Sequence, residues 1–105
     1  MRVLLDECVP KPLKNYLPEH TVQTVVEMGW SGTKNGALLK RMNTEGFTVL
    51  LTADQNLRYE QNLKKVGISV VVMVARSNRM TNLVPLIPKV KDVLAKILPG
   101  EVIEV

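Results

Sequence analysis

The chain has 105 residues, of which 46% are hydrophobic, and this length suits one domain with a buried core and is too short for two. Its single cysteine, Cys8, excludes an internal disulfide, and no apolar run approaches the roughly 18 residues of a membrane helix, so we expect a single cytoplasmic domain over residues 1–105 without membrane association. The net charge of +4 is weak evidence for a nucleic-acid partner, because an ordinary charged surface explains it more simply.

Short apolar runs alternate with amphipathic segments along the chain. Strands are predicted at residues 3–5, 21–26, 48–51, 69–74 and 102–103, where apolar or β-branched side chains dominate. Helices are predicted after Pro10, at residues 36–45, at residues 57–65 and from residue 83 to 97. Pro85 and Pro88 must lie in the first turn of the last helix, or that helix begins late. The pattern is that of an α/β protein.

The alternation of strands and helices favours right-handed crossovers and a mostly parallel sheet. The apolar runs at residues 49–51 and 70–74 agree with this arrangement, because parallel strands are buried on both faces. We therefore expect a three-layer α/β/α sandwich with a sheet of four or five strands. In such sheets, ligands bind beyond the carboxyl ends of the strands, and this edge, which we call the rim, is where a functional site is expected.

Polar side chains follow each of the first four predicted strands. The first strand leads to Asp6 and Glu7, the second to residues 34–35, the third to residues 52–56 and the fourth to residues 76–79. Because the carboxyl ends of parallel strands lie on the same rim, we expect Asp6 and Asp54 to meet in one pocket. Carboxylates held close together repel each other, and Mg²⁺ or Mn²⁺ relieves that repulsion. Such an ion can activate water and stabilise a phosphoryl oxyanion, as phosphodiester hydrolysis requires.

These residues also have structural explanations. Asp54 is a suitable N-cap for the helix that follows it, and Glu7 points away from Asp6 if the strand geometry continues. Asp6 is harder to explain in this way, because a carboxylate at the end of a buried strand is costly unless it is paired or binds a metal. Basic side chains on the same rim suit an RNA backbone, with ordinary surface charge as the alternative: Lys34, Arg76 and Arg79.

Three segments of the chain resemble the small PIN-like proteins in order and spacing. Residues 1–10, MRVLLDECVP, resemble the short strand, the Asp-Glu-Asn and the following Leu-Pro or similar pair of those proteins. Residues 32–39, GTKNGALL, resemble their Gly-x-x-Asp-x-x-Ile/Leu-Leu segment, and residues 51–57, LTADQNL, resemble their Leu-Thr-x-Asp-x-Asp-Phe segment. The resemblance covers roughly residues 1–75, and the three segments together are fairly specific.

The resemblance implies a PIN-like fold and a metal-dependent ribonuclease, of the kind found as VapC toxins in toxin–antitoxin pairs. It implies that Asp6, Glu7 and Asp54 are the catalytic acids, and that Asp6 and Asp54 bind Mg²⁺ or Mn²⁺. Thr52 is expected to orient a ligand or a water molecule. The resemblance also implies RNA as the substrate, a cognate antitoxin as a partner and a homodimer.

The sequence departs from the family pattern at three positions. Asn35 and Asn56 stand where the relatives carry aspartate, and Cys8 stands where they carry asparagine. An amide carbonyl still coordinates Mg²⁺, but a neutral dipole attracts the ion less than a carboxylate does. Asn35 and Asn56 are therefore predicted metal ligands in a site of reduced metal affinity.

Two other functions fit parts of the pattern. A PIN-like domain with a disabled site would act as a binding module for a protein or an RNA. A receiver-like phosphoacceptor domain would also place an acidic pair after its first strand and an aspartate, here Asp54, after its third. Receivers carry a Lys-Pro pair after a fifth strand, and residues 102–105 show no such pair, so we expect this alternative to be the least favoured.

Overall fold

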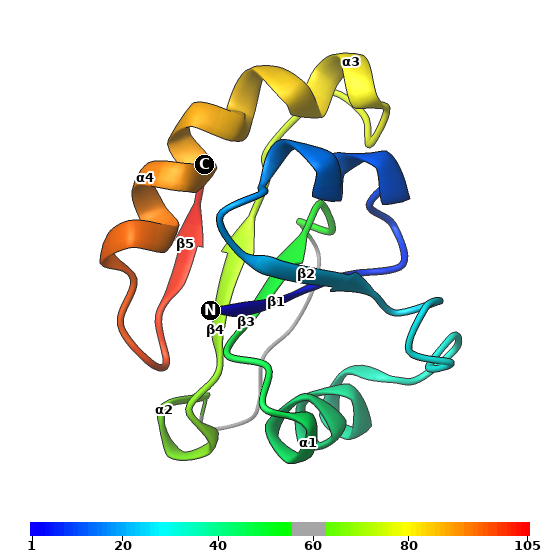
Figure 1. Ribbon diagram of the computed structural model, residues 1–105, viewed down its shortest axis with the longest axis vertical. Helices are drawn as coiled ribbons and strands as arrows, with labels where there is room; N and C mark the ends of the chain where they lie inside the picture. Colours follow the sequence, from blue (N-terminus) through cyan, green and yellow to red (C-terminus); the bar gives the residue numbers. More distant parts are fainter. Residues whose placement is uncertain (56–62) are drawn as a thin grey trace.

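The computed structural model describes residues 1–55 and 63–105. Within these residues, five strands form one parallel sheet with the order β2-β1-β3-β4-β5 (Figure 1). The strands are β1 (Arg2–Leu5), β2 (Thr21–Thr24), β3 (Val49–Thr52), β4 (Ser69–Val72) and β5 (Val102–Glu104). The predicted α/β class and the predicted parallel sheet are therefore confirmed.

Helices connect successive strands of the sheet. The 3-10 helix η1 (Lys11–Tyr16) follows β1, α1 (Asn35–Glu45) follows β2, and α2 (Leu63–Val66) precedes β4. The connection from β4 to β5 contains α3 (Met80–Leu83), the 3-10 helix η2 (Val84–Leu86) and α4 (Ile87–Lys96). Residues 57–62 of the helix predicted at 57–65 lie outside the described residues, and residues 63–66 are helical.

The helix predicted from residue 83 to 97 is not continuous. Pro85 lies in the first turn of η2 and Pro88 in the first turn of α4, where a proline costs no intrahelical hydrogen bond. Of the two alternatives predicted for the last helix, the late start is the one observed, because α4 begins at Ile87. Its buried side chains, Ile87, Val90 and Leu94, lie on the face that packs against the sheet.

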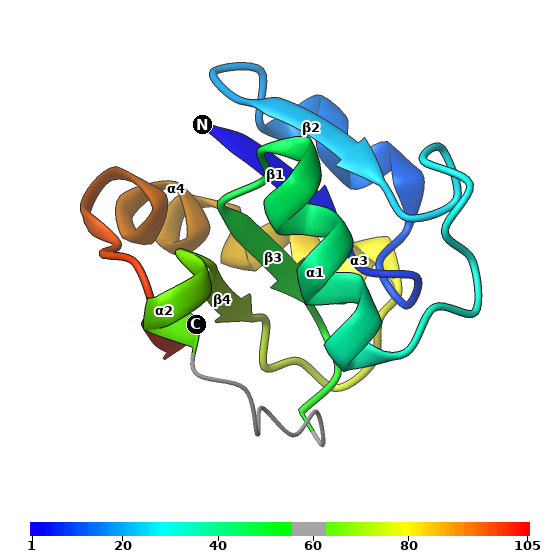
Figure 2. The ribbon, with the colours of Figure 1, turned by 90° about the horizontal axis from the view of Figure 1, so that it is seen from below.

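Apolar side chains cover both faces of the sheet, because successive strand residues point to opposite faces. Val3 and Leu5 belong to one buried cluster with side chains of η1, α3 and α4, and Leu4 belongs to a second cluster with side chains of α1 and α2. Figures 1 and 2 show these two groups of helices on different sides of the strands.

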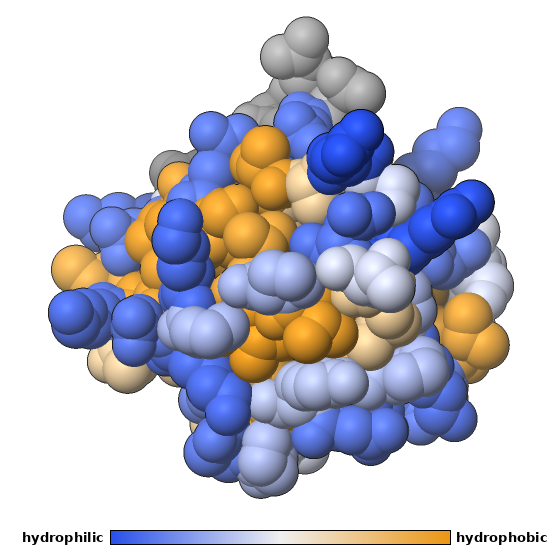
Figure 3. Space-filling model, turned by 90° about the horizontal axis from the view of Figure 1, so that it is seen from above, coloured by the Kyte–Doolittle hydropathy of each residue, from blue (hydrophilic) through white to orange (hydrophobic). Residues whose placement is uncertain are grey.

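Figure 3, which is seen from above, shows apolar surface between hydrophilic side chains. Across the described part of the chain, no helix is both long and apolar enough to span a membrane.

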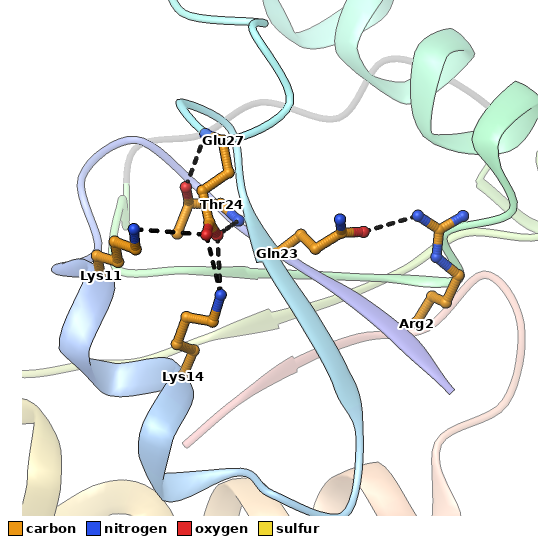
Figure 4. Close-up of polar contacts among 6 residues, drawn as sticks. All are labelled: Arg2, Lys11, Lys14, Gln23, Thr24 and Glu27. Atoms are coloured by element: carbon orange, nitrogen blue, oxygen red, sulfur yellow. Dashed lines mark hydrogen bonds and ion pairs between the residues drawn. The ribbon is translucent and has the colours of Figure 1, made fainter.

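Arg2 anchors the carboxyl-terminal end of α1 to the sheet. Its guanidinium donates a hydrogen bond to the main-chain carbonyl of Glu45, the last residue of α1. It also donates to Gln23 Oε1 on β2 at 2.7 Å (Figure 4). The same group lies 4.2 Å from the ring centroid of Phe47, within the range of a cation–π interaction. One end of α1 is thus fixed at the edge of the sheet opposite the rim.

Candidate functional site

Asp6 and Asp54 follow two neighbouring strands and lie at the rim. Asp6 directly follows β1, and Asp54 lies two residues beyond the end of β3. These strands are adjacent and parallel, with Leu5 opposite Leu51, and the backbone N–H of Asp6 donates to the carbonyl of Leu51 at 3.0 Å. The chain leaves β1 toward β2 and leaves β3 toward β4, on opposite sides. Such a reversal of strand order is where open α/β sheets bind ligands.

A fully buried hydroxyl connects the two acidic residues. Thr52 Oγ1, on a residue with 0% exposure, donates to Asp6 Oδ2 at 2.8 Å and accepts the backbone N–H of Asp54 at 3.0 Å. The other carboxylate oxygen of Asp6 accepts the backbone N–H of Glu7 at 2.9 Å. The Asp6 carboxylate is therefore held from both sides, in the way that hydrogen-bonded partners orient a ligating carboxylate.

Asp54 lines a cleft of about 500 Å³ at the rim. The walls come from the loops after three strands: Cys8 after β1, residues 53–55 after β3, and residues 75–78 after β4. Met73 and Ala53 give the cleft an apolar part, and Arg76 is an exposed cation at its edge. The cleft thus combines a carboxylate with a guanidinium, the pair of charges needed to hold a cation and a phosphate.

Two side-chain amides that the sequence analysis did not predict cross this cleft. Asn78 Nδ2 donates to the carbonyl of Cys8 at 2.9 Å, and Gln55 Nε2 reaches the carbonyl of Ala75 at 3.4 Å. They tie the loops after β1, β3 and β4 together. Their signal in the sequence is their position directly after predicted strands, although their residue types alone indicate no chemistry.

Asp6 lines a different hollow from Asp54. This second hollow, of about 340 Å³, lies between the loop after β1 and the end of β2, and Glu7 and Lys11 also line it. Contrary to the prediction from the sequence, the structure does not place Asp6 and Asp54 in one pocket. The two residues line separate hollows, and Thr52 Oγ1 links the Asp6 carboxylate to the backbone N–H of Asp54.

A charged network closes the far side of the second hollow (Figure 4). Glu27 accepts hydrogen bonds from Lys14 Nζ at 3.0 Å and from the backbone N–H of Thr24 at 2.9 Å, and its own N–H donates to Thr24 Oγ1 at 3.0 Å. Lys11 Nζ lies 3.5 Å from the same carboxylate. The ion pair with Lys14, followed by the bond from Thr24, lowers the pKa of Glu27 to about 2. This network was not predicted from the sequence.

The remaining predicted site residues are distributed along the rim. Glu7 is exposed, and its Oε1 accepts the backbone N–H of Gly32 at 2.6 Å. Lys34 is exposed at the N-cap of α1, and Arg79 is exposed at the N-cap of α3. Asn35 begins α1, and Asn56 lies outside the described residues.

The donor atoms decide whether a cation fits this rim. Among the described residues, no three side chains of His, Cys, Asp or Glu gather closely enough to hold a metal ion. The predicted set differs from such a group, because it contains two carboxylates and two amides, and Mg²⁺ keeps several waters and needs one or two carboxylates from the protein. The chemistry of the donors therefore fits a hard divalent cation.

A scan of protein-family models, a search of curated proteins and a search of solved structures each returned no match.

Proposed function

We propose that the protein is a PIN-type ribonuclease that uses Mg²⁺ or Mn²⁺ and has the three-layer PIN-like sandwich fold. Two of the segments that resemble PIN-like proteins contain β1 and the end of β3, and these strands are neighbours in the sheet. Their acidic residues therefore follow adjacent strands at the reversal of strand order, where α/β sheets bind ligands. This agreement between sequence motif and topology supports the proposal.

The observation that carries the proposal is the hydrogen-bonded chain from Asp6 through Thr52 to Asp54. The hydroxyl donates to a carboxylate that follows one strand and accepts a backbone N–H that follows the next strand. It therefore holds both loops in place. Buried hydroxyls need partners, but this one is bonded to the acid for which the sequence offers the weakest structural explanation. A preorganised carboxylate of this kind is what a metal-dependent hydrolase requires.

Asp6 retains the lone pairs that a cation would need. Each carboxylate oxygen has about two acceptor sites. Oδ2 of Asp6 accepts from Thr52 at 2.8 Å and from the Cys8 thiol at 4.0 Å, whereas Oδ1 accepts only the Glu7 N–H among the described residues and keeps a second acceptor site. Asp6 and Asp54, with the amides of Asn35 and Asn56, are the residues that would hold the ion. When bound, Mg²⁺ or Mn²⁺ would supply an activated water and stabilise negative charge on a phosphoryl oxygen.

The cationic side chains of the rim would hold the substrate. Arg76 lies at the edge of the cleft that Asp54 lines, and its planar guanidinium suits a phosphate oxygen pair. Arg79 and Lys34 extend the basic rim on either side as exposed N-cap residues. In this scheme Thr52 orients Asp6, Arg76 binds the RNA backbone, and the apolar part of the cleft lies beside the phosphate.

The proposal extends to the biological role. We infer that the protein is the toxin of a toxin–antitoxin pair in the cytoplasm, that it forms a homodimer and that a cognate antitoxin binds it. A gene for a small DNA-binding protein beside the gene of this protein would support that role. Co-expression of the two products would then suppress any RNA cleavage seen with the toxin alone.

The strand order gives specific support to a second function. The order β2-β1-β3-β4-β5 is also that of flavodoxin-like folds and of receivers such as CheY, in which Asp54 would be the phosphoacceptor. This support is an analogy of fold and does not concern the site itself. Incubation with acetyl phosphate and Mg²⁺, followed by intact-mass spectrometry, distinguishes the two functions. A phosphorylated wild type with an unmodified Asp54→Asn variant would favour the receiver.

Cleavage of labelled single-stranded RNA tests the proposed nuclease. The wild type is incubated with Mn²⁺, with Mg²⁺ and with EDTA, beside the Asp6→Asn and Asp54→Asn variants. We expect metal-dependent cleavage by the wild type and a loss of at least 100-fold in both variants, because each removes one charge of the metal site. RNA binding without cleavage under all conditions would instead identify a non-catalytic binding module.

A further inference from the structure

We propose that Glu7 is a positioning residue that fastens the start of α1 to the acidic rim, and that it does not bind the cation. This inference rests on the proposed function, because it assigns a role within the same site. Glu7 Oε1 accepts the backbone N–H of Gly32 at 2.6 Å, across 25 residues of sequence. The bond joins the loop that follows β1 to the loop that precedes α1.

The backbone and the side chain of Glu7 serve different partners. The backbone N–H donates to Asp6 Oδ1 at 2.9 Å, whereas the exposed carboxylate turns to Gly32. Glu7 lies in the turn after β1, in which the Val9 N–H donates to the carbonyl of Asp6 at 3.0 Å. Its side chain bonds the neighbouring loop, while that of Asp6 bonds Thr52. The Glu7 carboxylate thus makes a charge-assisted hydrogen bond to the loop before α1, whereas the Asp6 carboxylate is bonded to Thr52 at the rim.

The loop that Glu7 contacts leads directly into α1. Gly32 has φ +77°, a left-handed conformation that a glycine adopts without strain. Lys34 is the N-cap of α1 and Asn35 is its first residue, three positions after Gly32. Three residues of chain span at most about 11 Å, so a shift of Gly32 is transmitted to the start of α1. Figure 2 shows this loop on the side toward which the arrowheads of β1 and β2 point.

The two ends of α1 have separate attachments to the sheet. At its carboxyl-terminal end, Arg2 bonds the carbonyl of Glu45, and before its amino-terminal end, Glu7 bonds Gly32. Local bonds, from Thr33 N–H to the carbonyl of Trp30 at 3.0 Å and from Arg41 to Thr33 Oγ1 at 3.2 Å, shape the loop without tying it to the acids. A further bond, from the Trp30 N–H to the carbonyl of Val25 at 3.0 Å, ties the loop to the end of β2. The Glu7 bond joins it to the loop that carries Asp6.

Two substitutions at Glu7 separate positioning from direct metal binding. Glu7→Gln keeps an oxygen that accepts the Gly32 N–H and removes the charge that a cation needs. Glu7→Ala removes both. We expect Glu7→Ala to lower RNA cleavage by 10- to 100-fold, as displaced supporting residues do at metal sites, and Glu7→Gln to stay within about threefold of the wild type. Glu104→Ala, at an exposed position on β5, is the control for loss of one acidic charge.

Hydrogen–deuterium exchange of the Gly32 amide gives a readout that does not depend on activity. Faster exchange in Glu7→Ala and wild-type exchange in Glu7→Gln are expected. Two results would overturn the inference: a Glu7→Gln variant that cleaves and binds Mn²⁺ as poorly as Glu7→Ala while Gly32 exchanges normally, or a Glu7→Ala variant with wild-type exchange. If the wild type cleaves no RNA and binds no Mn²⁺, the proposed ribonuclease fails, and the exchange data still decide whether Glu7 fastens the loop.

Discussion

At the residue scale, the Thr52 hydroxyl makes two hydrogen bonds that matter for the site. It donates to Asp6 and accepts the backbone N–H of Asp54, and Thr52 itself has no solvent exposure, whereas the two acids are half-buried. Removal of the hydroxyl leaves the Asp54 N–H without this acceptor and the Asp6 carboxylate with one donor fewer. An unsatisfied buried group costs about 1–3 kcal/mol, so the residue matters for stability as well as for the geometry of the acids.

The pair Thr52→Val and Thr52→Ser tests this role. Thr52→Val keeps the branched shape and lacks the hydroxyl, and we expect it to lose about 1–3 kcal/mol of unfolding free energy and roughly 10- to 100-fold in activity. Thr52→Ser keeps the hydroxyl and is expected to retain most of the activity. Urea denaturation and RNA cleavage measure the two effects. Equal activity of the valine and serine variants would contradict the role of the hydroxyl.

The amides at positions 35 and 56 lead to a prediction about metal affinity. We expect weak binding and a preference for Mn²⁺ over Mg²⁺, because two neutral ligands replace two charged ones and Mn²⁺ insists less on ideal octahedral geometry. The double variant Asn35→Asp with Asn56→Asp should bind Mn²⁺ at least tenfold more tightly and cleave RNA faster. Isothermal titration measures the affinity. An unchanged affinity would mean that these amides do not limit the site.

The sequence predicted which acids lie on the rim but not what holds them. Asp6 and Asp54 could be placed because an α/β pattern assigns strand ends to a common edge. The bonds of Glu27 to Lys14 and of Asn78 to Cys8 could not be predicted, because they depend on side-chain directions across loops that are distant in sequence.

At the scale of elements, Glu27 links η1 to the end of β2 and makes stability depend on pH. Its folded pKa of about 2 lies below the ordinary value of 4.5, so the unfolded chain binds the proton more tightly and stability rises with pH in this range. The contribution is complete above about pH 5 and is lost as the pH falls toward 2. We expect Glu27→Gln to lose on the order of 1 kcal/mol at pH 7 and almost nothing at pH 2. Thermal denaturation across this pH range measures the loss of stability in Glu27→Gln. An equal loss at both pH values would contradict a stabilising role of the ionised Glu27 carboxylate.

Two glycines provide a matched test of how α2 packs against the turn before β5. Gly100 has φ +87°, and a Cβ there would lie 2.6 Å from the Cα atom of Lys64 on α2, whereas Gly29 has φ +75° and no neighbour within 4 Å. Gly29→Ala should cost about 1–2 kcal/mol from left-handed strain alone. Gly100→Ala should cost a further 1–3 kcal/mol, approximately, from overpacking. Urea denaturation measures both losses of stability. Equal losses in the two variants would mean that the backbones of Gly100 and Lys64 are not in close contact.

The elements themselves were largely predictable, and the exceptions have physical causes. The runs that became β3 and β4 are buried at every position, as parallel strands require, and are apolar except at Thr52 and Ser69. The helix predicted from residue 83 was divided because Pro85 and Pro88 each needed a first turn of its own. The apolar spacing shows which side chains face the core but cannot show where one helical segment ends and the next begins.

At the scale of the whole molecule, stability should depend on the metal ion if Asp6 and Asp54 bind it. A ligand that binds the folded state alone stabilises it by about 2.7 kcal/mol at a concentration of 100 times its Kd. Mn²⁺ should therefore raise the melting temperature of the wild type, and Asp6→Asn should remove most of that increase. The sheet order places the two acids on adjacent strands, so a single ion should account for the effect.

Calorimetric titration of the wild type, Asp6→Asn and Asp54→Asn with Mn²⁺ tests the central claim, that Asp6 and Asp54 share one divalent cation. We predict one binding site per chain in the wild type and at least a tenfold loss of affinity in each variant. The double variant should be little weaker than either single one, because the two carboxylates act on the same ion. The claim would be contradicted by wild-type affinity in both single variants, or by a wild type that binds no Mn²⁺ at millimolar concentration.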